Sequence, residues 1–162
     1  MGLRQRIFAL GKLGEAVGVL CLWIMLGTTL WDVVGAKVFK APLSGATELV
    51  SFAQLLAIGA GMGMTLLLGR HIHVEYALHL LPRPVRGLLS AIGYLLVAVF
   101  FAVIALYTWR FAQGLAQSGE VLPGLRTPVY PFAYAFWGLL VLSTLYGLYL
   151  FLEQLMNLRE RR

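Results

Sequence analysis

The chain has 162 residues, of which 60% are hydrophobic and 12% are charged, and its formal net charge is +6. A soluble domain carries about 25% charged residues, so this composition excludes an ordinary water-soluble bundle. The positive charge does not indicate binding to DNA or RNA, because the Lys and Arg residues flank apolar stretches and form no separate basic cluster.

Four stretches contain no charged residue, namely 16–31, 49–69, 87–109 and 127–152. About 20 helical residues, each rising about 1.5 Å, cross the hydrocarbon core of a bilayer. The first stretch reaches that length if its helix extends from about 13 to 36. The sequence therefore predicts one all-α domain over residues 1–162, with transmembrane helices at about 13–36, 47–69, 84–113 and 127–157.

The first predicted span has the basic and apolar character of a signal peptide, but no small-x-small cleavage site precedes Asp32. We therefore expect an uncleaved first helix. Cys21 is the only cysteine and lies inside this span, which excludes a disulfide and a thiolate metal site. Pro42 and Gly45 then interrupt the chain in a predicted loop over 37–46.

The second predicted span begins beside Thr47, a plausible N-cap, with Glu48 in the first turn where the helix dipole favours an anion. After this span, the apolar residues of 71–81 recur at i, i+3, i+4 and i+7. That spacing predicts a short amphipathic helix in the cytoplasmic head-group plane, ending at Pro82. The third and fourth spans are joined by a predicted loop over 114–126.

The basic residues are distributed unequally between the two sides of the predicted helices. Nine of the thirteen fall on the side of the two chain ends, and the other four are Lys37, Lys40, Arg110 and Arg126. Since Lys and Arg are retained in the cytoplasm, both termini are expected to be cytoplasmic. Aromatic residues that favour the head-group level mark the opposite side: Trp31, Trp109, Tyr130 and Tyr134.

The spans lack the groups that membrane chemistry needs. A transporter's own site uses acidic or polar groups near mid-depth, often at a broken helix, and these spans hold no charged residue there. Haem ligation needs histidines inside helices, whereas all three histidines lie in the 71–81 connection. They favour interfacial positions over a metal site. We predict no enzymatic activity, no cofactor and no self-sufficient ion-coupled transport.

Small residues that allow close helix packing in lipid recur in the first two spans. Gly14 and Gly18 lie near the start of the first, and Ala53, Ala57 and Gly61 are spaced by four residues in the second. These faces could pack within the four-helix unit or against another membrane subunit.

The chain resembles the small membrane subunit (DctQ-like, or Q subunit) of tripartite ATP-independent periplasmic (TRAP) transporters. The most specific similarity is the run Gly69-Arg70-His71-Ile72-His73-Val74-Glu75, followed by Leu80-Leu81-Pro82 and a basic start to the third span. The Trp31 region, Glu48 and the run Leu125-Arg126-Thr127-Pro128 fit the same pattern.

The resemblance implies a three-part importer in the bacterial inner membrane. A periplasmic binding protein would capture a solute such as a C4-dicarboxylate, a sialic acid, another sugar acid or ectoine. A separate large subunit would hold the sodium and substrate sites and move like an elevator. The small subunit would enlarge the static frame of that large subunit and help to dock the binding protein.

The resemblance also suggests roles for individual residues. Candidates for packing against the large subunit are Gly14, Gly18, Ala53, Ala57 and Gly61. Candidates for docking the binding protein are Lys37, Lys40, Glu48, Glu120 and Arg126. His73 and Glu75 are expected to anchor the interfacial helix.

Two other functions compete with this interpretation. A membrane anchor of a respiratory redox enzyme would want haem-ligating histidines within the spans, which the sequence lacks. A small multidrug-type exporter would need a membrane-embedded carboxylate, for which Glu15 and Asp32, near the ends of the first span, are the candidates. The sequence identifies neither the solute nor the helix face that meets a partner.

Overall fold

The computed structural model describes residues 3–67 and 83–160. These ranges form four helices: α1 (Leu3–Val38), α2 (Ala46–Leu67), α4 (Arg83–Ser118) and α5 (Tyr130–Glu160). Each contains a segment that is long and apolar enough to cross a membrane. The predicted all-α membrane fold with four spanning helices is thus confirmed.

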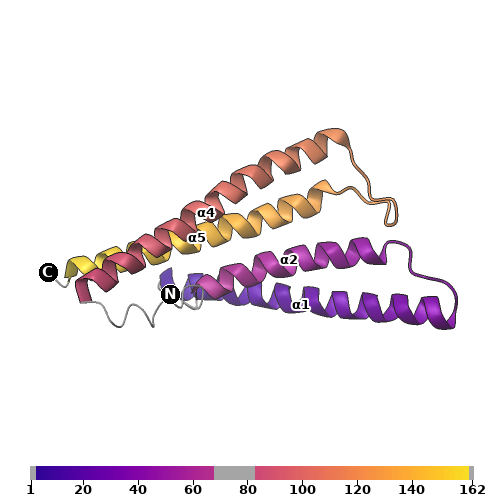
Figure 1. The fold of residues 1–162 in the computed structure, drawn as a ribbon, viewed down its shortest axis with the longest axis horizontal. Coiled ribbons are helices and arrows are strands. Elements are labelled where there is room, and N and C mark those ends of the chain that lie inside the picture. The colour runs from indigo at the N-terminus through magenta and orange to yellow at the C-terminus, as the bar shows by residue number, and fades with distance from the viewer. Residues whose placement is uncertain (1–2, 68–82, 161–162) are drawn as a thin grey trace.

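The four helices lie in a row in the order α1, α2, α5, α4 (Figure 1), with α1 packed on α2, α2 on α5, and α5 on α4. Along the helix axes, the start of α1 and the end of α5 lie at the same end of the molecule, which we call the terminal end. Residues 39–45 and 119–129 connect the helices at the opposite end, the loop end. This arrangement agrees with two termini on one side of a membrane, and which side is cytoplasmic stays a prediction.

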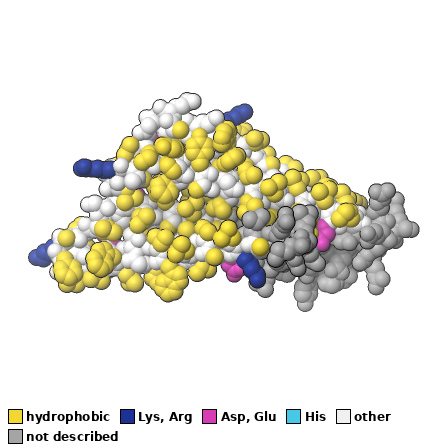
Figure 2. Space-filling model, turned by 180° about the vertical axis from the view of Figure 1, so that it is seen from behind, with side chains coloured by type: hydrophobic (Ala, Val, Ile, Leu, Met, Phe, Trp, Pro, Cys, Tyr) yellow, Lys and Arg dark blue, Asp and Glu magenta, His cyan; other side chains and the backbone are white. Residues whose placement is uncertain are grey.

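A row of helices leaves much apolar surface uncovered. Figure 2 shows hydrophobic side chains over most of the described part of one face, with basic side chains at its margins. The edge helix α1 is the extreme case, since Trp23, Leu30 and Trp31 are all exposed. In a membrane, such a surface contacts lipid or another membrane protein.

The helices at the edges of the row are longer than the predicted spans. α1 begins ten residues before position 13, because residues 3–12 contain no proline; hydropathy marks the part in lipid and not the full helix. α4 continues to Ser118 and ends before Gly119, whose φ of 63° suits glycine. At about 1.5 Å per residue, both are about 54 Å long, so they tilt in the bilayer or project beyond it.

The starts of α2 and α5 also differ from the predictions. α2 begins at Ala46, and the carbonyl of Gly45 accepts a hydrogen bond from the amide of Leu49 (3.0 Å), so Thr47 is not the N-cap. α5 begins at Tyr130, three residues after Thr127, because the carbonyl of Thr127 accepts a bond from the Leu122 amide (3.0 Å) instead. The predicted interfacial helix over 71–81, with His73 and Glu75, lies outside the described residues.

The buried core lies where α2, α4 and α5 meet. Its cluster consists of Leu66 from α2, Phe101 and Ala105 from α4, and Leu140 from α5. A second cluster joins α4 and α5 nearer the loop end and contains Ala112, Leu115 and Ala133. The prevalence of alanine lets these helices approach closely.

Candidate partner-binding surfaces

The first connection of the loop end folds back on the end of α1. The Leu43 amide donates to Oδ1 of Asp32 (2.8 Å), and the carbonyl of Gly35 accepts from the amides of Phe39 (3.1 Å) and Ala41 (3.0 Å). A Cβ on Gly35 would lie 2.8 Å from the carbonyl oxygen of Ala41, so a side chain there would open this turn.

The second connection is a small hairpin. Val121 and Pro128 form an antiparallel bridge, and the Val129 amide donates to the carbonyl of Glu120 (3.2 Å). Its turn closes with a bond from the Arg126 amide to the carbonyl of Leu122 (2.8 Å), with Arg126 at a φ of 51°. A non-glycine residue rarely adopts this left-handed conformation. It persists where the surrounding structure, here the hydrogen bonds of the hairpin, holds the backbone in place.

Glu48 joins the two connections. Its Oε1 accepts a hydrogen bond from the Gly124 amide (3.0 Å) and its Oε2 accepts one from the Leu125 amide (2.9 Å). Bonds from backbone amides to a carboxylate are stronger than bonds between neutral groups. The first turn of α2 is therefore hydrogen-bonded to the tip of the hairpin.

Two glycines allow the connections to approach this closely. A Cβ on Gly124 would lie 2.6 Å from Cα of Gly45 and 2.8 Å from its nitrogen, both of which are backbone atoms that cannot turn aside. Gly45 itself has a φ of 83°, which side chains disfavour. The glycine pair and Glu48 together make the loop end one connected surface.

The structure divides the predicted docking residues into two groups. Lys37, Lys40, Glu120 and Arg126 are exposed at the loop end. Glu48 is half-buried, and both of its carboxylate oxygens accept hydrogen bonds inside the chain; its predicted contact with the binding protein is not tested by these bonds. Contact of the exposed residues with a partner stays a prediction.

Aromatic rings fix the helices near the loop end. Trp109 of α4 contacts Tyr134 and Trp137 of α5, with ring centroids 5.4 and 4.7 Å apart, respectively. Phe52 of α2 stacks on Phe132 of α5 at 4.1 Å. These contacts extend the link between α2, α5 and α4 from the core toward the connections.

The predicted small-residue faces are largely used inside the chain. A Cβ on Gly18 would lie 3.6 Å from Cβ of Ala60 and 3.7 Å from the carbonyl oxygen of Ala57, and Gly14 faces the carbonyl of Ala60 in the same way. These two glycines therefore form the seam between α1 and α2. Ala53 is buried, whereas Gly61 is exposed with no neighbouring atom at the position of a Cβ.

In the described ranges, no group of three His, Cys, Asp or Glu residues could hold a metal ion. The hydroxyl of Ser143 is buried and donates to the carbonyl of Leu139 (2.9 Å), and that of Thr144 donates to the carbonyl of Leu140 (2.9 Å). These hydroxyls bond to their own helix, as the carbonyls of preceding turns allow.

Sequence reasoning did not identify Asp32, Gly35 and the pair Gly45 and Gly124 as the residues that shape the loop end. Glycines in predicted connections were a usable signal for tight turns, but the sequence does not tell which glycines meet. The carboxylate of Asp32, at the end of an apolar span, was the other available signal.

These features define a multi-pass membrane protein whose described polar groups mainly join its own connections and helices. A sequence profile described as "Tripartite ATP-independent periplasmic transporters, DctQ component" matches residues 25–157. The chain therefore belongs to the DctQ family and is a small permease subunit of a TRAP transporter, as its resemblance indicated. A comparison with curated proteins gives no match.

Proposed function

We propose that this subunit enlarges the static frame of a large, sodium-coupled membrane subunit and helps a periplasmic binding protein to dock, during import of an organic acid or a related solute. The observation that carries the proposal is that the four described helices hold long segments without a charged residue, namely 16–31, 49–67, 87–109 and 130–152. A site for a sodium ion or an anionic solute needs polar or charged groups at that depth.

The connected loop end supports the docking part of the proposal. Glu48 and the two opposed glycines tie the connections to each other, so the exposed charges beside them are carried on a surface of fixed shape. A partner binds such a surface at a smaller cost in conformational entropy than it binds two independent loops. Under this proposal the loop end faces the periplasm.

The exposed apolar surface of the row supports the framing part. Both edge helices present large side chains along their length, including Leu30 of α1 and Leu106 of α4. In lipid, helices associate through close packing and not through the hydrophobic effect. An elongated apolar face can therefore pack against a larger subunit and extend the part of it that does not move.

The direct test is reconstitution of the chain in proteoliposomes, alone and with the large subunit and binding protein encoded with it. We expect sodium-driven solute uptake by the complete set, no uptake by this chain alone, and co-purification of this chain with the large subunit. Uptake by the chain alone, or full uptake when it is omitted, would contradict the proposal. Because the chain belongs to the DctQ family, we no longer propose a redox-enzyme anchor or a multidrug-type exporter.

A further inference from the structure

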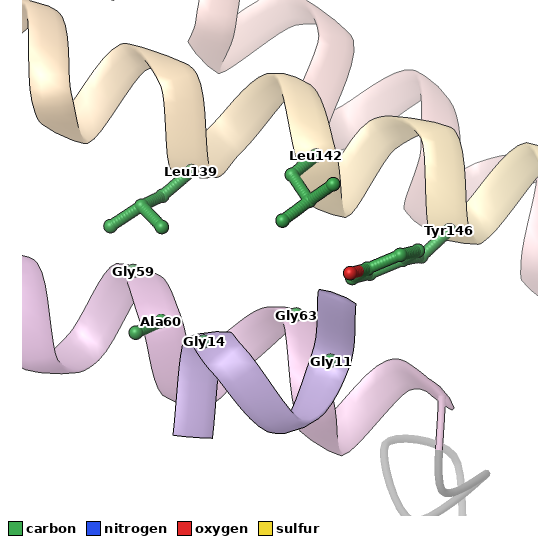
Figure 3. Close-up of a pocket in the computed structure, with 8 residues that line it drawn as sticks. All are labelled: Gly11, Gly14, Gly59, Ala60, Gly63, Leu139, Leu142 and Tyr146. Carbon is green, nitrogen blue, oxygen red and sulfur yellow. The ribbon is translucent and has the colours of Figure 1, made fainter. Parts of the chain in front are cut away.

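A narrow cleft lies between α1, α2 and α5 in the half of the row nearer the terminal end (Figure 3). Small residues form most of its walls, and one tyrosine enters it from α5. The residues that line it are Gly11, Gly14, Gly59, Ala60, Gly63, Leu139, Leu142 and Tyr146.

Tyr146 presents a polar group to this cleft. Its side chain is only 3% exposed, and its hydroxyl has no hydrogen-bond partner among the described residues. Figure 3 shows the hydroxyl pointing into the space between the helices. A buried hydroxyl without a partner is unfavourable, and inside a membrane protein the surroundings offer no bulk water to replace one.

A second polar group lies beside the cleft on α2. The carbonyl oxygen of Ala60 is 3.7 Å from the position that a Cβ on Gly14 would occupy, and both residues line the cleft. A helical carbonyl bonded to the amide four residues later keeps a second lone pair that can accept another hydrogen bond. The cleft therefore holds a donor from α5 and an acceptor from α2.

The size of the cleft selects the ligand. Its free volume of about 10 Å³ has room for one water molecule, and a carboxylate, a lipid headgroup or a sugar acid does not fit. We propose that one buried water molecule binds here, accepting a hydrogen bond from Tyr146 and donating one to the carbonyl of Ala60. This water joins α5 to the α1–α2 pair, and the inference does not depend on the proposed transport function.

The water can be tested on the full chain, co-purified with its large subunit and reconstituted in lipid bilayers, with ¹³C-tyrosine incorporated at position 146. Solid-state NMR then measures the transfer of magnetisation from water to the labelled ring. We expect early transfer in the native chain and a several-fold loss in Gly14→Ala, whose added methyl group occupies the cleft at an ordinary contact distance from Ala60.

Gly27→Ala, on the same helix, is the matched control, since a Cβ there meets no atom within 4 Å, and it should leave the transfer unchanged. The C–O stretching band of the labelled tyrosine should shift in Gly14→Ala as the hydroxyl loses its partner. Absence of early transfer in the native chain, or transfer that survives Gly14→Ala, would overturn the proposal. An unshifted band in Gly14→Ala would also overturn it, because it would assign the hydroxyl to a protein group.

Discussion

Glu48 shows how one side chain can organise both connections of the loop end. Its position near the start of a helix follows from the sequence, because a carboxylate is favourable at the positive end of a helix dipole. Its partners do not follow, since the amides it binds lie 76 and 77 residues further along the chain. A local pattern cannot encode contacts over such a separation.

Replacing Glu48 by Ala should loosen the hairpin from the start of α2. The amides of Gly124 and Leu125 lose their acceptor, at a cost of about 1–3 kcal/mol. We expect the hydrogen exchange of these two amides to accelerate about tenfold or more, because each 1.4 kcal/mol corresponds to about a factor of ten. Glu120→Ala, at an exposed position in the same hairpin, is the control. Equal exchange in both variants would show that Glu48 does not hold the hairpin.

At the scale of the helices, the sequence determined their number and approximate positions. The runs of apolar residues are long, and each is bounded by charges, prolines or glycines. The order α1, α2, α5, α4 was not predictable, because lipid-facing and core-facing positions are both apolar and the usual contrast between helix faces is weak. The helices differ from the predicted spans where α1 continues beyond its apolar run and where α5 begins three residues after Thr127, whose carbonyl is bonded in the hairpin.

The helices α4 and α5 approach each other closely at Gly147. A Cβ on Gly147 would lie 3.1 Å from Cβ and 3.2 Å from Cα of Ala98, so a larger residue must push the helices apart. Gly147→Val should destabilise the chain by about 1–3 kcal/mol, the usual cost of overpacking. A thermal-aggregation assay in detergent should show a lower melting temperature.

Gly138→Val is the matched control for this prediction, since Gly138 lies on the same helix and a Cβ there meets no atom within 4 Å. Both substitutions add the same side chain and the same loss of helix propensity, so the difference between them isolates the contact with Ala98. Equal melting temperatures for the two variants would mean that α4 can move away from α5 without cost.

At the scale of the whole molecule, the row of helices separates two kinds of surface. The long sides are largely apolar, and the exposed charged side chains of the two described connections lie at the loop end. The sequence anticipated this division through its charge bias. It could not anticipate that the two connections form one surface, because that depends on Gly45 meeting Gly124 and on the bonds of Glu48.

The exposed basic residues of the loop end, Lys37, Lys40 and Arg126, should steer an acidic surface of the binding protein toward this subunit. Replacing all three by Gln should lower the association rate constant about tenfold at low ionic strength, with a smaller change in the dissociation rate constant. Surface plasmon resonance with the assembled membrane complex in nanodiscs measures both constants. The difference from the native complex should disappear in high salt, because mobile ions screen exposed charges.

Lys12→Gln combined with Arg86→Gln removes basic residues at the terminal end and should leave the association rate unchanged. A loop-end variant that associates as fast as the native complex at low salt would show that the binding protein approaches another surface.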